Sequence, residues 1–224
     1  MTQLERDQLV LHAAFLGLAL VALLLPAGPS RGWRIALLVG VYHLATVVVA
    51  RQGRHRTWLR LWWFAAVTSV FQIMPDAVLV EGLGVLEFPD DGFPDIGPVS
   101  AHMAAMWTVP IVMIVAVADA AGRRYGERAS WTAALLTATV VFVAAEATLP
   151  RLGVWEPVDV ATIGTLALYI VPAEIFLGVA VLAGARWTRD GNALWAVPVA
   201  AVISLAYTGA AAVSWLVVER GLLG

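Results

Sequence analysis

Long apolar runs, separated by short polar or arginine-containing segments, make up most of this chain. They can be placed approximately at residues 8–26, 33–50, 57–75, 98–119, 129–149, 161–185 and 193–218. Each run is close to the roughly 20 residues that a helix needs to cross a bilayer. Only helices and closed barrels satisfy their backbone hydrogen bonds in lipid, and the runs lack the two-residue alternation of barrel strands. The pattern predicts an all-α polytopic membrane bundle of about seven transmembrane helices, forming a single domain over residues 1–224.

Composition supports this class and excludes several functions. Hydrophobic residues make up 61% of the chain and charged residues only 13%, with a mean hydropathy of +0.83. All 14 basic residues are arginine, so a retinal Schiff base, which requires a lysine, is excluded. Cysteine is absent, which excludes disulfides and thiolate metal sites. The histidine spacing fits no metal site, no Gly-x-Gly-x-x-Gly fingerprint precedes a predicted helix, and no cofactor or nucleic-acid partner is predicted.

The arginines predict the orientation of the bundle. Ten of them lie before the first run or between the second and third, fourth and fifth, and sixth and seventh runs, and four lie on the opposite side. Loops rich in arginine face the cytoplasm. We therefore expect an integral protein of a bacterial plasma membrane with a cytoplasmic N-terminus, and we interpret the first run as a retained span rather than a cleaved signal.

An internal repeat is visible in the two long loops on the other side. Leu83-Gly-Val-Leu-Glu87 and Leu152-Gly-Val-Trp-Glu156 agree at four of five positions. Asp76 precedes the first glycine by eight residues, and Glu146 precedes the second by seven. Two helix-loop-helix units, at about residues 57–119 and 129–186, are predicted, and repeated membrane units often form a site at their interface.

Carboxylates within apolar runs are the candidate catalytic groups, because a charge in the bilayer is costly and usually functional. Glu174 is the first choice. If its span begins near residue 161, it lies about 13 residues, or roughly 20 Å, inside the membrane. A helix-to-helix hydrogen bond to a polar neighbour is the structural alternative for Glu174. Asp76 and Glu146 are expected near outer helix ends, where both could serve as proton donor or base or could simply end their helices.

These residues give the chain a resemblance to the small membrane lycopene cyclases of the heterodimeric bacterial and archaeal type, also found in fungal bifunctional carotenoid enzymes. Glu146, Gly153-Val-Trp155 and Pro172-Ala-Glu174 match that family's acid, Gly-x-Trp and Pro-x-Glu-Glu elements, with Ile175 replacing the second glutamate. Asp76 and the segment 84–86 match the first unit more loosely. The chain is also similar, through helix count and paired acids, to the broader group of integral membrane terpene cyclases.

The resemblance implies a non-redox, proton-initiated cyclisation of an apolar polyene or prenylated substrate through a carbocation. In apolar surroundings the ionised form of a carboxyl is disfavoured, so it can stay protonated near neutral pH and act as a general acid. Aromatic faces can stabilise the cation. The candidate substrate-binding residues lie in or beside the repeat units and are Trp63, His102, Trp107, Trp155 and Tyr169.

Two other functions compete with a cyclase that takes a lipophilic isoprenoid from membrane lipid. A small proton-coupled transporter or channel would use repeats and buried acids, and it predicts broken helices and an aqueous route at the middle of the bilayer. A non-catalytic membrane scaffold is the third. A cyclase instead predicts a closed, aromatic-lined cavity that opens toward lipid.

Overall fold

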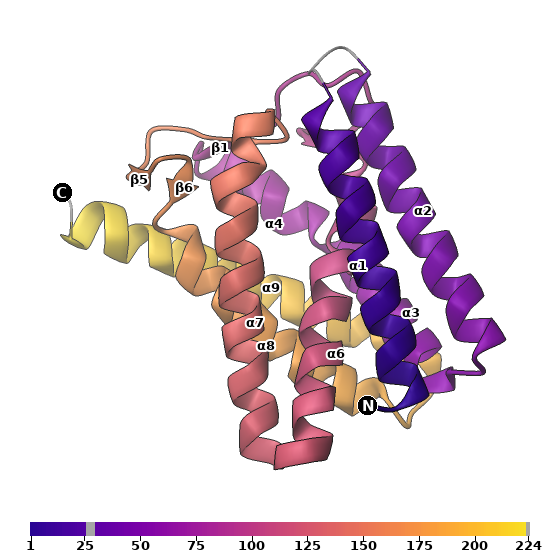
Figure 1. The fold of residues 1–224 in the computed structure, drawn as a ribbon. Coiled ribbons are helices and arrows are strands. Elements are labelled where there is room, and N and C mark those ends of the chain that lie inside the picture. The colour runs from indigo at the N-terminus through magenta and orange to yellow at the C-terminus, as the bar shows by residue number, and fades with distance from the viewer. Residues whose placement is uncertain (26–29, 223–224) are drawn as a thin grey trace.

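Long helices form the protein, as the predicted class requires. The computed structural model describes residues 1–25 and 30–222, and Figure 1 shows its helices bundled together. In chain order the helices are α1 (Gln3–Leu24), α2 (Arg31–Gln52), α3 (Arg56–Phe71), α4 (Ile73–Ala77), the π-helical η1 (Val78–Gly82), α5 (Met103–Met106), α6 (Thr108–Tyr125), α7 (Glu127–Thr148), the 3-10 turn η2 (Pro150–Leu152), α8 (Ile170–Thr188), the 3-10 turn η3 (Ala193–Trp195), α9 (Ala196–Trp215) and the π-helical η4 (Leu216–Leu222).

Six of the described helical segments are long and apolar enough to cross a membrane. They are Arg31–Gln52, Arg56–Gly82, Met103–Tyr125, Glu127–Leu152, Ile170–Thr188 and Ala193–Leu222. A helical membrane protein is therefore confirmed, while a seventh span stays a prediction. The predicted span at 8–26 corresponds to α1, and its last residue lies outside the described part of the chain.

Two predicted spans began too early. Residues 98–102 and 161–169 are not helical, and α8 begins only at Ile170. Each segment instead belongs to a short hairpin, and the two hairpins turn at Gly97 (φ 62°) and Gly164 (φ 67°). These hairpins are largely apolar, so hydropathy alone joined them to the helices that follow them.

Three two-stranded antiparallel sheets lie together with the long loops at one end of the bundle, which we call the loop end (Figure 1). They were not predicted. β2 (Asp95–Ile96) pairs with β3 (Val99–Ser100), and β5 (Thr162–Ile163) pairs with β6 (Leu166–Ala167). The third sheet joins β1 (Leu86–Glu87) to β4 (Glu156–Pro157), so it connects the two loops to each other.

The two matched pentapeptides have the same local geometry. Gly84 and Gly153 have left-handed φ values of 66° and 68°, and the valine after each is buried. Glu87 and Glu156, which occupy the same position in the two pentapeptides, are cross-strand partners. Each loop then forms its glycine hairpin before the next helix, so the order of features agrees in both.

The interior of the bundle is packed by α3, α6, α7, α8 and α9. Ile111, Ile114, Leu177 and Leu182 are among its fully buried side chains. α7 and α8 approach so closely that a Cβ at Gly178 would overlap the Ala138 methyl. Large apolar side chains on the outer helix faces are exposed, among them Leu136, Val140, Leu205 and Val213. An apolar outer surface of this kind fits hydrocarbon rather than water.

Ion pairs hold the opposite end, where the N-terminus lies (Figure 1). Glu5 accepts hydrogen bonds from Arg123 at 2.9 Å and Arg124 at 2.8 Å. Asp7 lies 2.8 Å from His55, just before α3. These contacts join α1 to the ends of α3 and α6, so α1 runs along the bundle with its N-terminus at this end.

Candidate active site

A cavity of about 220 Å³ lies toward the loop end of the bundle. One water molecule needs only ~10–15 Å³ of cavity volume, so this cavity accommodates a far larger group. Aliphatic, methionine and aromatic side chains form nearly all of its wall. Three carboxyls interrupt that wall, those of Asp76, Glu146 and Glu174, and no basic residue is among the described residues that line it.

Glu174 lies in the first turns of α8 and is 3% exposed. Its Oε2 is buried and has no hydrogen-bond partner among the described residues. The helix start from which its depth was counted is wrong, because α8 begins at Ile170, four residues before Glu174, and not near residue 161. Pro172 is for the same reason a first-turn proline, where no helical N–H is needed.

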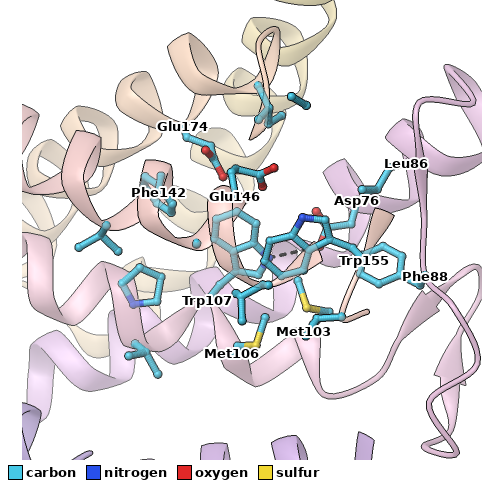
Figure 2. Close-up of a pocket in the computed structure, with 18 of the residues that line it drawn as sticks. Asp76, Leu86, Phe88, Met103, Met106, Trp107, Phe142, Glu146, Trp155 and Glu174 are labelled. Atoms are coloured by element: carbon cyan, nitrogen blue, oxygen red, sulfur yellow. Dashed lines mark hydrogen bonds between the residues drawn. The ribbon is translucent and has the colours of Figure 1, made fainter. Parts of the chain in front are cut away.

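Glu146 lies in the last turn of α7 and is also buried. Figure 2 shows its carboxyl next to that of Glu174, and the two side chains interact electrostatically. Neither has a cation partner among the described residues. Two neighbouring carboxyls in an apolar wall do not both ionise readily, so this pair is suited to hold a proton.

Asp76 differs from Glu174 because it has a hydrogen-bond donor. It is buried in α4, and its Oδ2 accepts a hydrogen bond of 3.2 Å from the indole N–H of Trp107 (Figure 2). The helix continues past Asp76 into η1, so this residue does not end its helix as the simpler interpretation proposed. A hydrogen bond donated to a carboxylate favours its ionised form.

Aromatic rings lie around the carboxyls. Trp107 sits between α5 and α6, and its ring centroid is 5.8 Å from that of Phe142 and 6.0 Å from that of Tyr207. Trp155 precedes β4 and lines the same cavity, as does Tyr169 at the start of α8. Burial raises the pKa of Tyr169, so its hydroxyl stays protonated at neutral pH.

Trp63 and His102 do not line this cavity. Trp63 is 40% exposed near the opposite end of the bundle, where its indole N–H donates to the Ala193 carbonyl at 3.0 Å. His102 is buried, and its Nε2 lies 2.8 Å from the Asp91 carboxylate, which also accepts from Ser100 Oγ at 3.2 Å. The structure therefore places these two predicted substrate-binding residues away from the other candidates.

Several cavity residues were not among the predicted site residues. They include Phe15, Met103, Met106, Phe142 and Tyr207. Each occupies an ordinary apolar position, so no residue type marks it. Phe142 lies four residues before Glu146 in α7, so it shares the face of that acid, and this helical spacing is the signal that would have found it.

No group of three or more histidine, cysteine, aspartate or glutamate side chains in residues 1–25 and 30–222 is arranged to hold a metal ion. The described side chains of the cavity include three carboxyl groups, which can transfer protons. The cavity wall offers aromatic faces beside those groups.

Residues 73–218 match a family described as a domain of unknown function, DUF6989. Because the match covers more than half of the chain, this protein belongs to that family. The matched region includes all three cavity carboxyls and both long loops. No curated protein and no solved structure matches the chain.

Proposed function

We propose that this protein is an integral membrane isoprenoid cyclase. The observation that carries the proposal is the set of three buried carboxyls, without a cation partner among the described residues, in an apolar and aromatic cavity. Cyclising a polyene without redox change requires a proton donor, a dry cavity for a cation and a base. The described wall of this cavity offers groups suited to all three.

The reaction begins when the Glu174–Glu146 pair gives a proton to an alkene carbon or to an epoxide oxygen. A carbon–carbon π bond then attacks the cation, which closes the ring and moves the positive charge along the chain. The faces of Trp107 and Trp155 lie beside the cavity and stabilise that charge. A carboxylate removes a proton from the carbon next to the final cation, so one proton enters, one leaves, and the product is an isomer.

The hydrogen bonds distinguish the carboxyls and support a division of roles. Asp76 accepts the Trp107 N–H, which favours a carboxylate and suits the terminal base. Glu174 Oε2 has no such donor among the described residues, which suits a neutral acid. Carboxyls in different surroundings are a common way to obtain an acid and a base from the same residue type.

We further infer that residues 57–119 and 129–186 are a duplicated unit and that the cavity lies where the two units meet. The equal φ values of Gly84 and Gly153 and the pairing of Glu87 with Glu156 support this inference. Asp76 comes from the first unit and Glu146 and Glu174 from the second, so neither unit contains the whole site.

The decisive experiment is expression in a host supplied with candidate prenylated precursors, followed by mass spectrometry for isomeric products. Glu174→Gln should lower product formation at least about 100-fold, the usual contribution of a general acid, while thermal stability stays near wild type. The matched control is Glu156→Gln, an exposed glutamate on β4. Wild-type turnover in Glu174→Gln would exclude Glu174 from the mechanism.

The same variant separates this proposal from proton-coupled transport. Purified protein in liposomes should show no proton flux above empty liposomes while it forms product from an isoprenoid. Glu174-dependent proton flux without cyclised product would favour the transporter.

A further inference from the structure

A second, smaller cavity lies beside the active site at the loop end. It measures about 80 Å³ and is lined by Arg31, Arg34 and Arg151 together with apolar residues of α1, α2 and η2. We call it the arginine pocket. No acidic side chain is among the described residues that line it. Three cations around one small cavity create a site that favours an anion.

Arg31 provides the second observation for an absent ligand. Its Nε is buried and has no hydrogen-bond partner within the described residues. Neither Arg31 nor Arg151 takes part in an ion pair in the described part of the chain. Leaving a buried charged donor unpaired is costly, so such a group points to a partner that residues 1–25 and 30–222 do not supply.

The loops hold two of these arginines in place. A Cβ at Gly153 would lie 2.7 Å from Nη1 of Arg31, and one at Gly164 would lie 3.3 Å from Nη2 of Arg151. Both glycines have left-handed φ values, so the backbone needs glycine there as well. Arg31 is also the first residue of α2, where the helix dipole adds partial positive charge.

The arginine pocket and the active-site cavity share part of their walls. Ile35 and Leu38, on successive turns of α2, line both of them. The two cavities are therefore direct neighbours, as is required if one molecule with an apolar chain and a polar head group is to occupy both. We propose that the arginine pocket binds the phosphate head group of a prenyl phosphate substrate, an inference that rests on the proposed cyclase function.

Arginine suits this ligand because its planar fork donates two hydrogen bonds to a phosphate at once. The head group acts only as an anchor. Cyclisation at the distal double bonds leaves the phosphate ester intact and involves only the gain and loss of a proton. Fixing the head group would set which carbon of the isoprenoid chain reaches Glu174 and would thereby select the length of the substrate.

Binding is measured by quenching of intrinsic tryptophan fluorescence in phosphatidylcholine nanodiscs, with geranylgeranyl phosphate and geranylgeraniol as probes. Wild-type protein should bind the phosphate at least about tenfold more tightly than the alcohol, because hydrogen bonds to charged groups are the stronger kind. Arg31→Gln and Arg151→Gln should each weaken phosphate binding about tenfold and leave alcohol binding unchanged. The control is Arg128→Gln, an exposed arginine in the first turn of α7 at the other end of the bundle.

One further variant tests whether the substitutions damage the fold, and two further measurements test which phosphate the pocket binds. Arg151→Lys keeps the charge but loses the fork, and it should give an intermediate affinity with wild-type thermal stability. Inorganic phosphate should compete with geranylgeranyl phosphate but not with the alcohol. If nanodiscs of phosphatidylglycerol abolish the phosphate preference, the pocket belongs to a bilayer phospholipid and the proposal is overturned.

Equal wild-type affinity for the two probes, or wild-type behaviour of both arginine variants, also overturns it. The binding assay needs no turnover, so the two proposals can fail separately. A phosphate preference that depends on Arg31 and Arg151, without any cyclised product, supports the pocket and removes the cyclase. Equal cyclisation of both probes by wild-type and variant proteins keeps the cyclase and removes the pocket.

Discussion

The hydrogen bond between Trp107 and Asp76 gives this cavity carboxyl a donor, whereas Oε2 of Glu174 has none among the described residues. Trp107→Phe keeps an aromatic ring but removes the donor, so one oxygen of the buried Asp76 loses its partner. We expect the free energy of unfolding to fall by about 1–3 kcal/mol, the usual cost of an unsatisfied buried group. Chemical denaturation in detergent measures this change.

The matched control is Trp187→Phe, because Trp187 is 78% exposed in the last turn of α8. It should change the unfolding free energy by less than about 0.5 kcal/mol. Equal effects of the two substitutions would mean that the indole N–H of Trp107 contributes nothing to Asp76.

At this scale, residue type in an apolar run was enough to select Asp76, Glu146 and Glu174, because a carboxyl there has few structural reasons to exist. Position was harder to predict. The depth of Glu174 was counted from the start of an apolar run near residue 161, whereas the helix begins at Ile170. Trp63 resembles Trp107 in sequence, yet only the fold shows that one points to the cavity and the other to a carbonyl near α9.

Helices α7 and α8 pack closely against each other at Gly178. Because a Cβ there would overlap Ala138, Gly178→Val should push the two helices apart. We expect a loss of about 1–3 kcal/mol of stability, typical of overpacking, and a lower Tm in detergent.

Gly209→Ala in α9 is the control, since nothing lies within 4 Å of a Cβ at that position. It should leave stability unchanged or raise it by up to about 1 kcal/mol through helix propensity. A wild-type Tm for Gly178→Val would show that the α7–α8 contact is not tightly packed.

The loop-end hairpin β2–β3 is fixed by a buried His102–Asp91 contact that should make stability depend on pH. Burial lowers the pKa of His102 below 6.5, against the opposing effects of its Asp91 hydrogen bond and the charges of Asp91 and Asp95, while the charge of Arg31 lowers it further. Below pH 6.5 the unfolded chain therefore binds a proton that the folded protein does not. Stability should fall as pH decreases from 6.5, by at most about 1.4 kcal/mol per pH unit.

Comparing thermal unfolding of the wild type with His102→Gln between pH 7.5 and 5 measures this contribution. Glutamine can still donate to Asp91 but does not titrate, so the difference between the two proteins should shrink or reverse as pH falls. A pH-independent difference would show that His102 titrates alike in both states.

Helices were predictable at this scale because their apolar runs are long, and each of the six candidate spans in the described residues overlaps a predicted run. The hairpins were not, since Thr162–Ala167 contains apolar residues and only one turn glycine. The glycines of the two pentapeptides have similar left-handed φ values, while the internal repeat itself stays a prediction.

For the whole molecule, the sequence predicted a membrane environment but not which residues line the cavity. The low content of charged residues indicated a membrane protein. The absence of lysine and cysteine excluded a retinal Schiff base, disulfides and thiolate metal sites. The cavity draws residues from α1, α2 and α4 through α9, including the break at Trp107, and such a combination depends on how helices pack. The family match from 73 to 218 covers the carboxyls, whereas Arg31 and Arg34 of the arginine pocket lie before it.

Orientation and the seventh span can be tested together, because a chain without cysteine gives no background in thiol labelling. Ile163 is exposed at the loop end, Tyr125 at the α6–α7 turn, and Arg6 near the start of α1. The arginine distribution predicts that an impermeant maleimide added to intact cells labels only Ile163→Cys. After permeabilisation, Tyr125→Cys and Arg6→Cys should be labelled as well.

Each departure from that pattern has one meaning. Labelling of Tyr125→Cys but not Ile163→Cys in intact cells would show that the bundle has the opposite orientation, and it would contradict the prediction that the arginine-rich loops are cytoplasmic. Labelling of Arg6→Cys together with Ile163→Cys would mean that α1 does not cross the bilayer, although it runs beside α2 and contacts the opposite end through Glu5. Protection of Arg6→Cys, combined with labelling of Ile163→Cys, establishes α1 as the seventh span, because the chain must then cross once more before α2 begins at Arg31.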